Sequence, residues 1–499
     1  MIKISPMFSD HMVLQRNKNI SVFGTGDDGC RVRVTLGGDT ASAQVVNGSW
    51  KAVLPAREAA VGLELTVSAD GFERTFTDVA VGEVWLAGGQ SNMEYELKNC
   101  TTGKAHLEND AGVNVRFYYV QKIVDKEPRY KEVIENNGWQ LFDSETAGCW
   151  SAVGYIFAKR LSEKLGCTVG VIGCNWGGTK AAHWMSIASL ERDIDMRLAL
   201  NKMIAAMTGK TEEEMTREYR EYETYDREWN VRKEKYYAEA ADPTWAECQE
   251  VCGVCRYPGP PLPLNPFSPE TLYRSMVKLV CPYTLAGFLY YQGESDDDEP
   301  QNYYKLLRGL IELWRTEWGD DDLPFLIVQL PMHLYKGDID SKSWCIIREA
   351  QEKAYRTIKN TGLAVAIDCG EFNEIHPHDK EKVAERLYEQ ALNVAYHLGG
   401  STPLLCRSVL FANGAAKIET NSDSPLEIRG QKNGFELAGA DGAYHPADFT
   451  LNGSRITVSS PEVPEPVAVR YLWTNYSADT PIYNADGQPL APICRSNEY

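Results

Sequence analysis

The feature that most constrains the fold is an alternation, in the middle of the chain, of short apolar runs with amphipathic helical stripes. Apolar residues recur at helical spacing in 153–165 and in 303–318. Continuous apolar strands separated by helices are typical of a parallel sheet that is covered on both faces. The sequence therefore predicts an α/β domain over residues 81–403. Its strand-length runs are Val84–Ala87, Val169–Gly173, Gly287–Tyr291, Phe325–Val328 and Leu363–Ile367.

The two ends of the chain predict β structure instead. Residues 1–80 contain short alternating runs, such as Arg31–Leu36, between turns rich in Gly and Asp. Residues 404–499 show the same pattern, for example in Arg455–Val458. Short alternating strands between such turns indicate β-sandwich regions. The pattern fits two separate modules and fits equally well two regions that pack on each other.

A long insertion interrupts the α/β domain at residues 200–270. Residues 211–240 are charged and rich in Tyr, and they predict a solvated helix or helical pair. The run Pro-Gly-Pro-Pro-Leu-Pro at 258–263 excludes a helix or a central strand there, because proline lacks the N–H that both require.

Charge and cysteine usage narrow the possible partners and the compartment. The 499 residues carry 51 Lys and Arg against 70 Asp and Glu, a net charge of −19 that repels phosphate backbones. No window approaches the ~18 apolar residues of a membrane span. The N-terminus leads directly into a predicted strand, and 13 cysteines, an odd number, indicate reduced thiols. We therefore expect a cytoplasmic protein that binds neither nucleic acid nor membrane.

In parallel sheets, ligands bind beyond the carboxyl ends of the strands, so chemistry is expected directly after each strand. The first strand is followed by Gly-Gly-Gln-Ser-Asn-Met-Glu, which places Ser91 on a tight turn before a helix. There, backbone N–H groups can stabilise developing negative charge. Met93 excludes the Gly-x-Ser-x-Gly elbow of α/β-hydrolases. The alternative is a capping box with Ser91 as N-cap and Glu94 three residues later.

Two further strand ends carry possible oxyanion donors. The second strand is followed by Asn-Trp-Gly-Gly-Thr, where Gly177 and Gly178 let backbone N–H groups approach a reacting oxygen closely. The third is followed by Gln-Gly-Glu-Ser-Asp, which supplies the uncharged amide of Gln292. The alternatives are an ordinary strand-to-helix turn and a Gln that satisfies a loop backbone group.

A candidate base follows the last strand. The loop Asn-Glu-Ile-His-Pro-His places His376 two residues after Glu374, a carboxylate that can orient the imidazole. A serine nucleophile requires such a base, and a His with an ordinary pKa of about 6.5 is largely neutral near pH 7. The alternatives are an exposed His-Pro turn and a weak metal pair with His378. The chain lacks the carboxylate-rich or His-Glu-x-x-His patterns that mark a metal site.

Three cysteines in the insertion form C-x3-C-x2-C, the spacing of iron–sulfur ligands in radical enzymes that bind S-adenosylmethionine. They are Cys248, Cys252 and Cys255. They lie in a polar insertion before a proline-rich loop rather than after a first barrel strand, so ordinary thiols are the better interpretation.

Together these blocks resemble the sialate O-acetylesterase family of carbohydrate acetylesterases, within the SGNH (GDSL-like) hydrolase superfamily. The resemblance covers nearly the whole chain. Its blocks are MVLQR (12–16), GQSNME around Ser91, NWGGT with Trp184, YYQGESD (290–296), REAQ (348–351), EIHP (374–377), VRYLW (469–473) and YNADGQPLAP (483–492).

The resemblance implies a flavodoxin-like three-layer α/β/α domain with β-sandwich regions at both ends, and an esterase that removes acetyl groups from sialic acid or related sugars. It implies no metal or organic cofactor. Ser91 would be the nucleophile and His376 the base, and the N–H groups of Ser91 and Gly178 with the Gln292 side chain would form the oxyanion hole. Candidate substrate contacts are Asn92, Trp184, Glu294 and Arg348, the last as a cation for an anionic sialate.

One position departs from the family pattern. The family usually carries Asp two residues before the His, and this chain has Glu374 there. We assign the orienting role to Glu374, with Asp368 or a Ser–His dyad as alternatives. Two other functions stay open: an acetylesterase for a plant polysaccharide such as xylan, and a non-catalytic carbohydrate-binding protein, which the Glu374 departure favours. The oligomeric state is not determined by the sequence.

Overall fold

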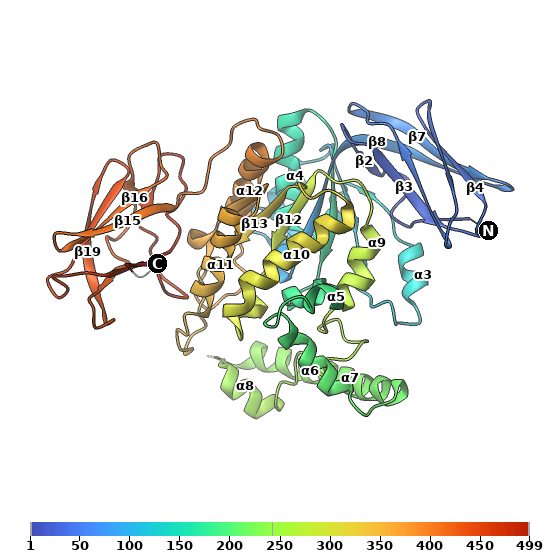
Figure 1. Cartoon of the computed structure of the whole chain (residues 1–499). Coiled ribbons are helices and arrows are strands. Elements are labelled where there is room, and N and C mark those ends of the chain that lie inside the picture. The colour runs from blue at the N-terminus through green and yellow to red at the C-terminus, as the bar shows by residue number, and fades with distance from the viewer. Residues whose placement is uncertain (1, 242, 498–499) are drawn as a thin grey trace.

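The computed structural model describes residues 2–241 and 243–497 and has a mixed α/β fold with several sheets (Figure 1). Its centre is a parallel sheet with the strand order β9-β11-β8-β12-β13-β14. The short strand β10 (Gln140–Leu141) extends it antiparallel to β9. The parallel strands are β8 (Phe72–Gly89), β9 (Val115–Tyr119), β11 (Val169–Asn175), β12 (Gly287–Tyr291), β13 (Phe325–Gln329) and β14 (Thr361–Val365).

The predicted strands lie in this sheet because their side chains are buried on both faces. Every residue of β11, β12, β13 and β14 is buried. Helices α4 (Ala152–Leu165) and α12 (Glu381–Val394) pack on each other and on the sheet. Helices α10 (Tyr303–Trp318) and α11 (Ser343–Thr357) form a second pair, with α11 against β13 and β14.

The N-terminal strands form two sheets beside the central one (Figure 1). Strand β8 belongs to both regions, because its first half pairs with β7 and β2 and its second half with β11 and β12. One continuous strand therefore joins the N-terminal β region to the central sheet. The N-terminal strands are β1 (Lys3–Ile4), β2 (Val13–Gln15), β3 (Ile20–Thr25), β4 (Arg31–Leu36), β5 (Asp39–Gln44), β6 (Ser49–Leu54) and β7 (Ala60–Ala69).

The C-terminal strands form a seven-stranded sheet and a two-stranded sheet. Figure 1 shows them at the opposite end of the molecule from the N-terminal strands, so the two β regions are separate modules. The C-terminal strands are β15 (Cys406–Ala412), β16 (Ala415–Thr420), β17 (Glu427–Ile428), β18 (Phe435–Ala438), β19 (Tyr444–Asn452), β20 (Arg455–Ser459), β21 (Ala468–Tyr471), β22 (Ile482–Tyr483) and β23 (Ile493–Ser496).

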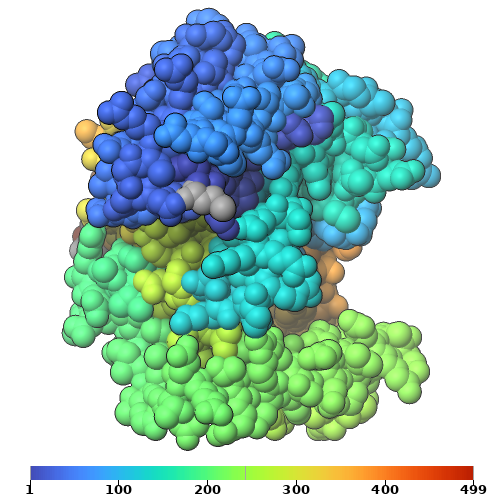
Figure 2. All heavy atoms as spheres, turned by 90° about the vertical axis from the view of Figure 1, so that its right-hand side faces the viewer, coloured from blue at the N-terminus to red at the C-terminus, as the bar shows by residue number. Residues whose placement is uncertain are grey.

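The insertion is helical and lies below the central sheet in Figure 1, where Figure 2 shows it as a separate lobe. Residues 212–239 form a single helix, α7 (Glu212–Glu239), which begins with a capping box between Thr211 and Glu214. It packs on α8 (Trp245–Cys252), and it follows α5 (Ile187–Leu190) and α6 (Arg197–Met207) in the chain. The remaining helices are α1 (Ser91–Glu94), α2 (Gly103–Asn109), α3 (Tyr130–Glu135) and α9 (Lys278–Val280). Within the described ranges, no helix combines the length and apolar character of a membrane span.

Candidate active site

Ser91 lies where β8 gives way to α1, and its hydroxyl faces an imidazole. Its Oγ is 2.8 Å from Nε2 of His376. The turn requires glycine at position 89, where φ is +131° and a Cβ would lie 2.1 Å from the carbonyl oxygen of Tyr291. The close approach of β8 and β12 thus determines where the chain turns and exposes Ser91.

The capping-box alternative for this turn is wrong. Gln90 occupies the N-cap position of α1, with no side-chain cap bond, and Ser91 is the first helical residue. The Glu94 carboxylate instead accepts the N–H of Gly177 at 2.7 Å and pairs with Lys122. Glu94 therefore connects the nucleophile turn to the loop after β11.

The loop that carries His376 is held on both sides. Asn373, in the left-handed region at φ +63°, donates its N–H to the carbonyl of Leu334 at 3.0 Å. The Asn92 amide, next to Ser91, donates to the Ile375 carbonyl at 2.9 Å. The base is therefore positioned by a residue of the nucleophile turn itself.

The environment of His376 favours its neutral form. Burial lowers the pKa of His376 below its ordinary 6.5, with a smaller lowering from the charge of Lys380. The Glu374 carboxylate acts in the opposite direction and raises the His376 pKa. A neutral imidazole beside Ser91 can accept a proton at pH 7 and below.

Of the two carboxylates considered for orienting His376, Glu374 lies beside it. Glu374 Oε1 accepts the His376 backbone N–H at 2.8 Å and lies 3.7 Å from the ring Nδ1. Asp368 is engaged elsewhere: its carboxylate accepts both terminal nitrogens of Arg386, which holds the Asp368 pKa below its ordinary value despite burial. Of these two carboxylates, only Glu374 is close enough to orient the imidazole ring of His376.

The glycine pair after β11 packs directly on the nucleophile. A Cβ at Gly177 would lie 3.2 Å from Cβ of Ser91. Gly178 adopts φ +74°, and within the described residues neither its N–H nor that of Ser91 donates to another group. Two backbone donors beside Ser91 can therefore serve a developing oxyanion.

Gln292 does not lie as the sequence analysis expected. Its amide nitrogen donates to Asp296 Oδ2 at 2.6 Å and to the Thr179 carbonyl at 3.0 Å, and the side chain is fully buried. An amide has two N–H donors, and both are engaged. The prediction that this amide faces an oxyanion is wrong for this structure. Gln292 instead holds the residue after Gly178, as its alternative interpretation proposed.

Asn92 and Glu294 belong to a buried polar cluster beneath Ser91, not to a substrate surface. Asn92 Nδ2 donates to Glu294 Oε1 at 2.7 Å, and Lys380 Nζ donates to Asn92 Oδ1 at 2.6 Å. Burial raises the pKa of Glu294 and lowers that of Lys380 to about 8. The Lys380 ammonium also lies 4.6 Å from the ring centroid of Tyr95. The cluster fixes the turn to the His376 loop.

Trp184 and Arg348 are likewise structural, and their assignment as substrate contacts is wrong. Both side chains are 0% exposed. Trp184 Nε1 donates to the Thr179 hydroxyl at 2.9 Å, below the glycine pair. Arg348 donates to four backbone carbonyls, those of Leu330, Pro331, Thr474 and Asn475, and so cannot pair with an anionic sugar.

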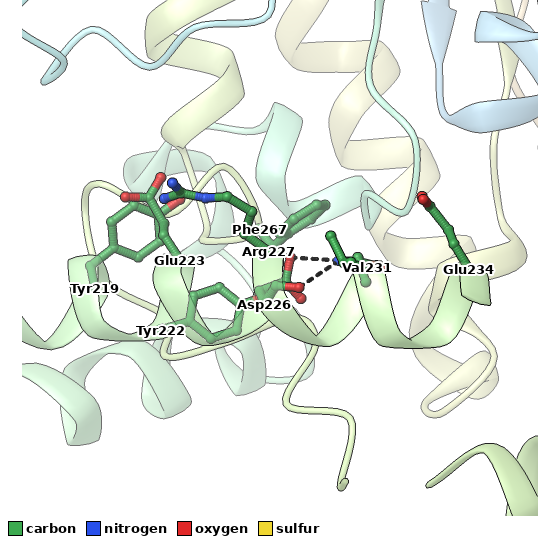
Figure 3. A pocket seen from close by; sticks show the side chains of 9 residues that line it. Tyr219, Tyr222, Glu223, Asp226, Arg227, Val231, Glu234 and Phe267 are labelled. Atoms are coloured by element: carbon green, nitrogen blue, oxygen red, sulfur yellow. Dashed lines mark hydrogen bonds between the residues drawn. The ribbon is translucent and has the colours of Figure 1, made fainter. Parts of the chain in front are cut away.

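The insertion contributes a wall to the site. The Tyr257 hydroxyl donates to the Gly178 carbonyl, and the Tyr257 ring lies 4.9 Å from that of Phe267. Phe267 in turn lines a cavity of about 480 Å³ against one face of α7 (Figure 3). Figure 3 shows the α7 side chains pointing from the helix toward the central domain.

Comparison with known proteins agrees with this geometry. Residues 262–393 match the family described as carbohydrate esterase, sialic acid-specific acetylesterase. Sialate O-acetylesterase of Mus musculus is 26% identical over 96% of this chain and 90% of its own length. That of Homo sapiens is 25% identical over 98% and 91%. The crystal structure of a carbohydrate acetylesterase from Xanthomonas citri superposes with a TM-score of 0.78 at 28% identity over 100% of both chains.

The chain is similar to sialate O-acetylesterases over nearly its whole length, and residues 262–393 match the family itself. The family resemblance that the sequence motifs indicated is thereby confirmed. The structure brings the GQSNME, NWGGT and EIHP blocks of this chain to one place, around Ser91 and His376. The YYQGESD block supports that place through Gln292 and Glu294, and the REAQ block contacts it through Gln351, which donates to the Gln292 carbonyl.

Two residues of the site, Lys380 and Tyr257, were not predicted from the sequence. Lys380 lies four residues after His376, and nothing in its neighbourhood marks it as buried under the nucleophile. Tyr257 immediately precedes the proline-rich run of the insertion, and only the folded chain shows that its hydroxyl reaches Gly178. Aromatic residues beside a Pro-Gly turn were the available signal for Tyr257.

The cysteines of the insertion are ordinary thiols. Cys248 and Cys252 are buried with Trp229 in a small apolar core between α7 and α8. Over the described residues, no three His, Cys, Asp or Glu side chains are grouped as metal ligands. Their role in this structure is to pack the insertion.

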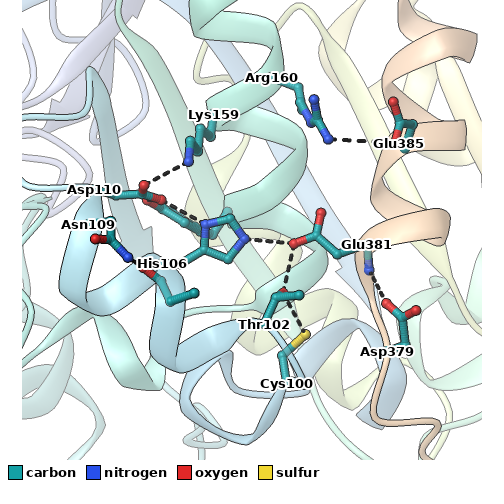
Figure 4. A network of polar contacts seen from close by, with 12 residues as sticks. Cys100, Thr102, His106, Asn109, Asp110, Lys159, Arg160, Asp379, Glu381 and Glu385 are labelled. Atoms are coloured by element: carbon teal, nitrogen blue, oxygen red, sulfur yellow. Dashed lines mark hydrogen bonds and ion pairs between the residues drawn. The ribbon is translucent and has the colours of Figure 1, made fainter.

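Behind the His376 loop, a second histidine joins three helices (Figure 4). His106 on α2 lies 2.8 Å from Asp110 through Nδ1 and 2.7 Å from Glu381, the first residue of α12, through Nε2. Asp110 also accepts from Tyr155 and Lys159 of α4. The Glu381 hydrogen bond is the largest cause that raises the His106 pKa.

Proposed function

We propose that this protein is a serine esterase that removes O-acetyl groups from sialic acid or related sugars. The observation that carries the proposal is the 2.8 Å contact between Ser91 Oγ and His376 Nε2 at the carboxyl end of β8. The named activities of the mouse and human relatives support the substrate class.

We also propose that the central domain is a flavodoxin-like SGNH hydrolase domain. Without its edge strand β9, the sheet order is β11-β8-β12-β13-β14, with the first strand second from the edge. That is the flavodoxin-like order, and its binding crevice lies where the strand order reverses, at the ends of β8 and β12. Ser91 follows β8 there.

The mechanism is two-step acyl transfer. His376 Nε2 accepts the Ser91 proton while Oγ attacks the acetyl carbonyl carbon. The N–H groups of Ser91 and Gly178 stabilise the tetrahedral oxyanion, which collapses as His376 returns the proton to the departing sugar oxygen. Water then loses a proton to His376 and attacks the acetyl-enzyme, and acetate leaves as Ser91 regains its proton. Glu374 favours the Nδ1–H tautomer that this sequence requires.

The test is acetate release from a panel of substrates. O-acetylated sialic acid and acetylated xylan distinguish the proposed substrate from the polysaccharide alternative. Ser91→Ala and His376→Ala are expected to lower kcat by about 10⁴-fold or more. Ser91→Ala is expected to leave the melting temperature unchanged, because Ser91 is not a helix cap. A folded wild-type protein that releases no acetate from any substrate contradicts the proposal and favours the non-catalytic alternative.

A further inference from the structure

One face of α7 lines a cavity, which distinguishes it from the rest of that solvated helix. Side chains at helical spacing of three and four residues, from Tyr219 to Glu234, line the cavity of about 480 Å³ opposite Phe267 (Figure 3). That volume lies in the range of roughly 300–1,000 Å³ typical of small-molecule sites. The lining residues on α7 are Tyr219, Tyr222, Glu223, Asp226, Arg227, Asn230, Val231 and Glu234.

A chain of side-chain and loop contacts joins the wall of the cavity to the nucleophile turn. The Tyr222 ring packs on Gly259, where a Cβ would meet it at 2.4 Å. Two residues earlier, Tyr257 bonds to the Gly178 carbonyl, and Gly177 lies against Ser91. These contacts place the cavity on the Tyr257 side of the loop that packs against Ser91.

The cavity lining suits the hydroxyls and ring faces of a sugar. Tyr222 and Phe267 offer aromatic surface, and the polar side chains offer both donors and acceptors, which hydroxyl groups need together. Over residues 2–241 and 243–497, the side chains of Arg227 and Glu234 make no hydrogen bond or ion pair. These two groups are therefore available to a ligand.

The charge of the lining selects against anions. The lining carries three carboxylates, on Glu223, Asp226 and Glu234, and one guanidinium, on Arg227; Arg220 pairs with Glu223, so Asp226 and Glu234 still outnumber Arg227. A carboxylate-bearing sugar is repelled from such a site, whereas a neutral sugar is not.

We propose that the face of α7 is a carbohydrate subsite for a neutral sugar residue that is linked to the acetylated one. The preferred substrate is then an acetylated oligosaccharide or glycoside rather than a free monosaccharide. The position of the acetyl group at Ser91 rests on the proposed function. Binding of the neutral sugar residue does not require catalysis, so it can be measured separately.

The test compares two double variants of α7. Arg227→Ala/Glu234→Ala removes two unpaired lining side chains seven residues apart. Glu228→Ala/Lys235→Ala is the matched control, because it removes the same two charges at the same spacing from residues outside the cavity lining. The first measurement is kcat/KM on O-acetylated sialyllactose, in which two neutral sugars are linked to the acetylated one, relative to O-acetylated free sialic acid. We expect the lining variant to lower this ratio by about tenfold and the control to keep the wild-type ratio.

The second measurement is binding without turnover. Calorimetry on Ser91→Ala uses xylotetraose, cellotetraose and lacto-N-tetraose as neutral probes and tetragalacturonic acid as the anionic one. We expect a neutral probe to bind, tetragalacturonic acid not to bind, and the lining variant to lose the binding. Failure of all neutral probes, tighter binding of the anion, or equal binding by the lining variant overturns the subsite. Absence of acetate release with neutral-probe binding intact contradicts only the proposed esterase.

Discussion

At the scale of single residues, the site depends on which proton-transfer groups are buried and which are paired. Burial lowers the pKa of His376 and so favours its neutral form, and Glu374 opposes that effect from 3.7 Å. Asp368, chemically the closer match to the family's usual Asp, is paired with Arg386 and does not touch the imidazole. The extra methylene of Glu374 lets one carboxylate oxygen serve both the His376 backbone N–H and the ring.

We expect Glu374→Gln to lower kcat by about tenfold to a hundredfold, because the neutral amide orients the imidazole less strongly. The change also removes a charge that raises the His376 pKa. The acid limb of kcat/KM, which lies below pH 6.5 in the wild type, is therefore expected to move to still lower pH. A pH profile from 4 to 8 measures both effects.

Asp368→Asn is the control for that profile. It breaks the pairing with Arg386 and is expected to reduce stability while leaving the acid limb in place. A shift of the limb with Asp368→Asn, and none with Glu374→Gln, would assign the orienting role to Asp368.

At the scale of elements, the catalytic loop is held by helix ends and by the insertion. The Thr101 N–H donates to the His378 carbonyl, so the segment before α2 contacts the His376 loop directly. His106 of α2 then bonds to the first residue of α12, which begins five residues after His376. The network of Figure 4 therefore ties the loop to helices on the outside of the sheet.

The His106 network makes a pH-dependent contribution to stability. The folded-state pKa of His106 is raised, chiefly by its hydrogen bond to Glu381. The contribution is fully present below the unfolded pKa of about 6.5 and is lost as pH rises through the folded-state value. His106→Gln is therefore expected to cost more unfolding free energy at pH 5.5 than at pH 9. Urea unfolding at both pH values measures the difference, and an equal cost at each would show that protonation plays no part.

Tyr257→Phe tests whether the insertion positions the oxyanion loop. Loss of the hydroxyl that bonds to the Gly178 carbonyl is expected to lower kcat on p-nitrophenyl acetate by up to about tenfold. Tyr225→Phe is the matched control, because that hydroxyl donates to the Val254 carbonyl within the insertion itself. Equal rates for the two variants would show that the Tyr257 contact is not used in catalysis.

At the scale of the whole molecule, the parallel strands were predictable because burial on both faces leaves long apolar runs. Strand β9 was missed because Arg116 interrupts its run. The Arg116 guanidinium reaches the carbonyls of His11 and Asp78, partners that only the folded chain provides. The continuity of β8 from the N-terminal region into the central sheet was also not predicted, because the two halves of the strand have different sequence patterns.

The residues of the candidate site also fall into those that the sequence predicted correctly and those that it did not. Ser91 and His376 could be predicted because few residue types serve as nucleophile and base, and both follow strands. Gln292, Trp184 and Arg348 lie in equally distinctive motifs, yet their polar atoms bond to buried groups of the protein itself. Residue type and spacing predict which groups gather at the sheet edge. They do not predict which of those groups face the solvent, because that depends on packing from distant segments.

Arg348 shows how the C-terminal module is coupled to the catalytic domain. It lies on α11 and donates to the carbonyls of Thr474 and Asn475, and Asn475 also accepts the N–H of His333. Burial lowers the Arg348 pKa to about 10, a cost that its carbonyl partners offset.

Arg348→Met fills similar space and leaves buried carbonyls without donors, so we expect a loss of about 3 kcal/mol or more of unfolding free energy. The corresponding fall in melting temperature is about 3–5 °C, because the entropy of unfolding grows with chain length. Arg407→Met removes an exposed arginine that makes no ion pair within the described chain and is the control. Calorimetry of both variants measures whether Arg348 couples the C-terminal module to the catalytic domain. Equal melting temperatures would mean that other contacts hold the module and that Arg348 does not couple it.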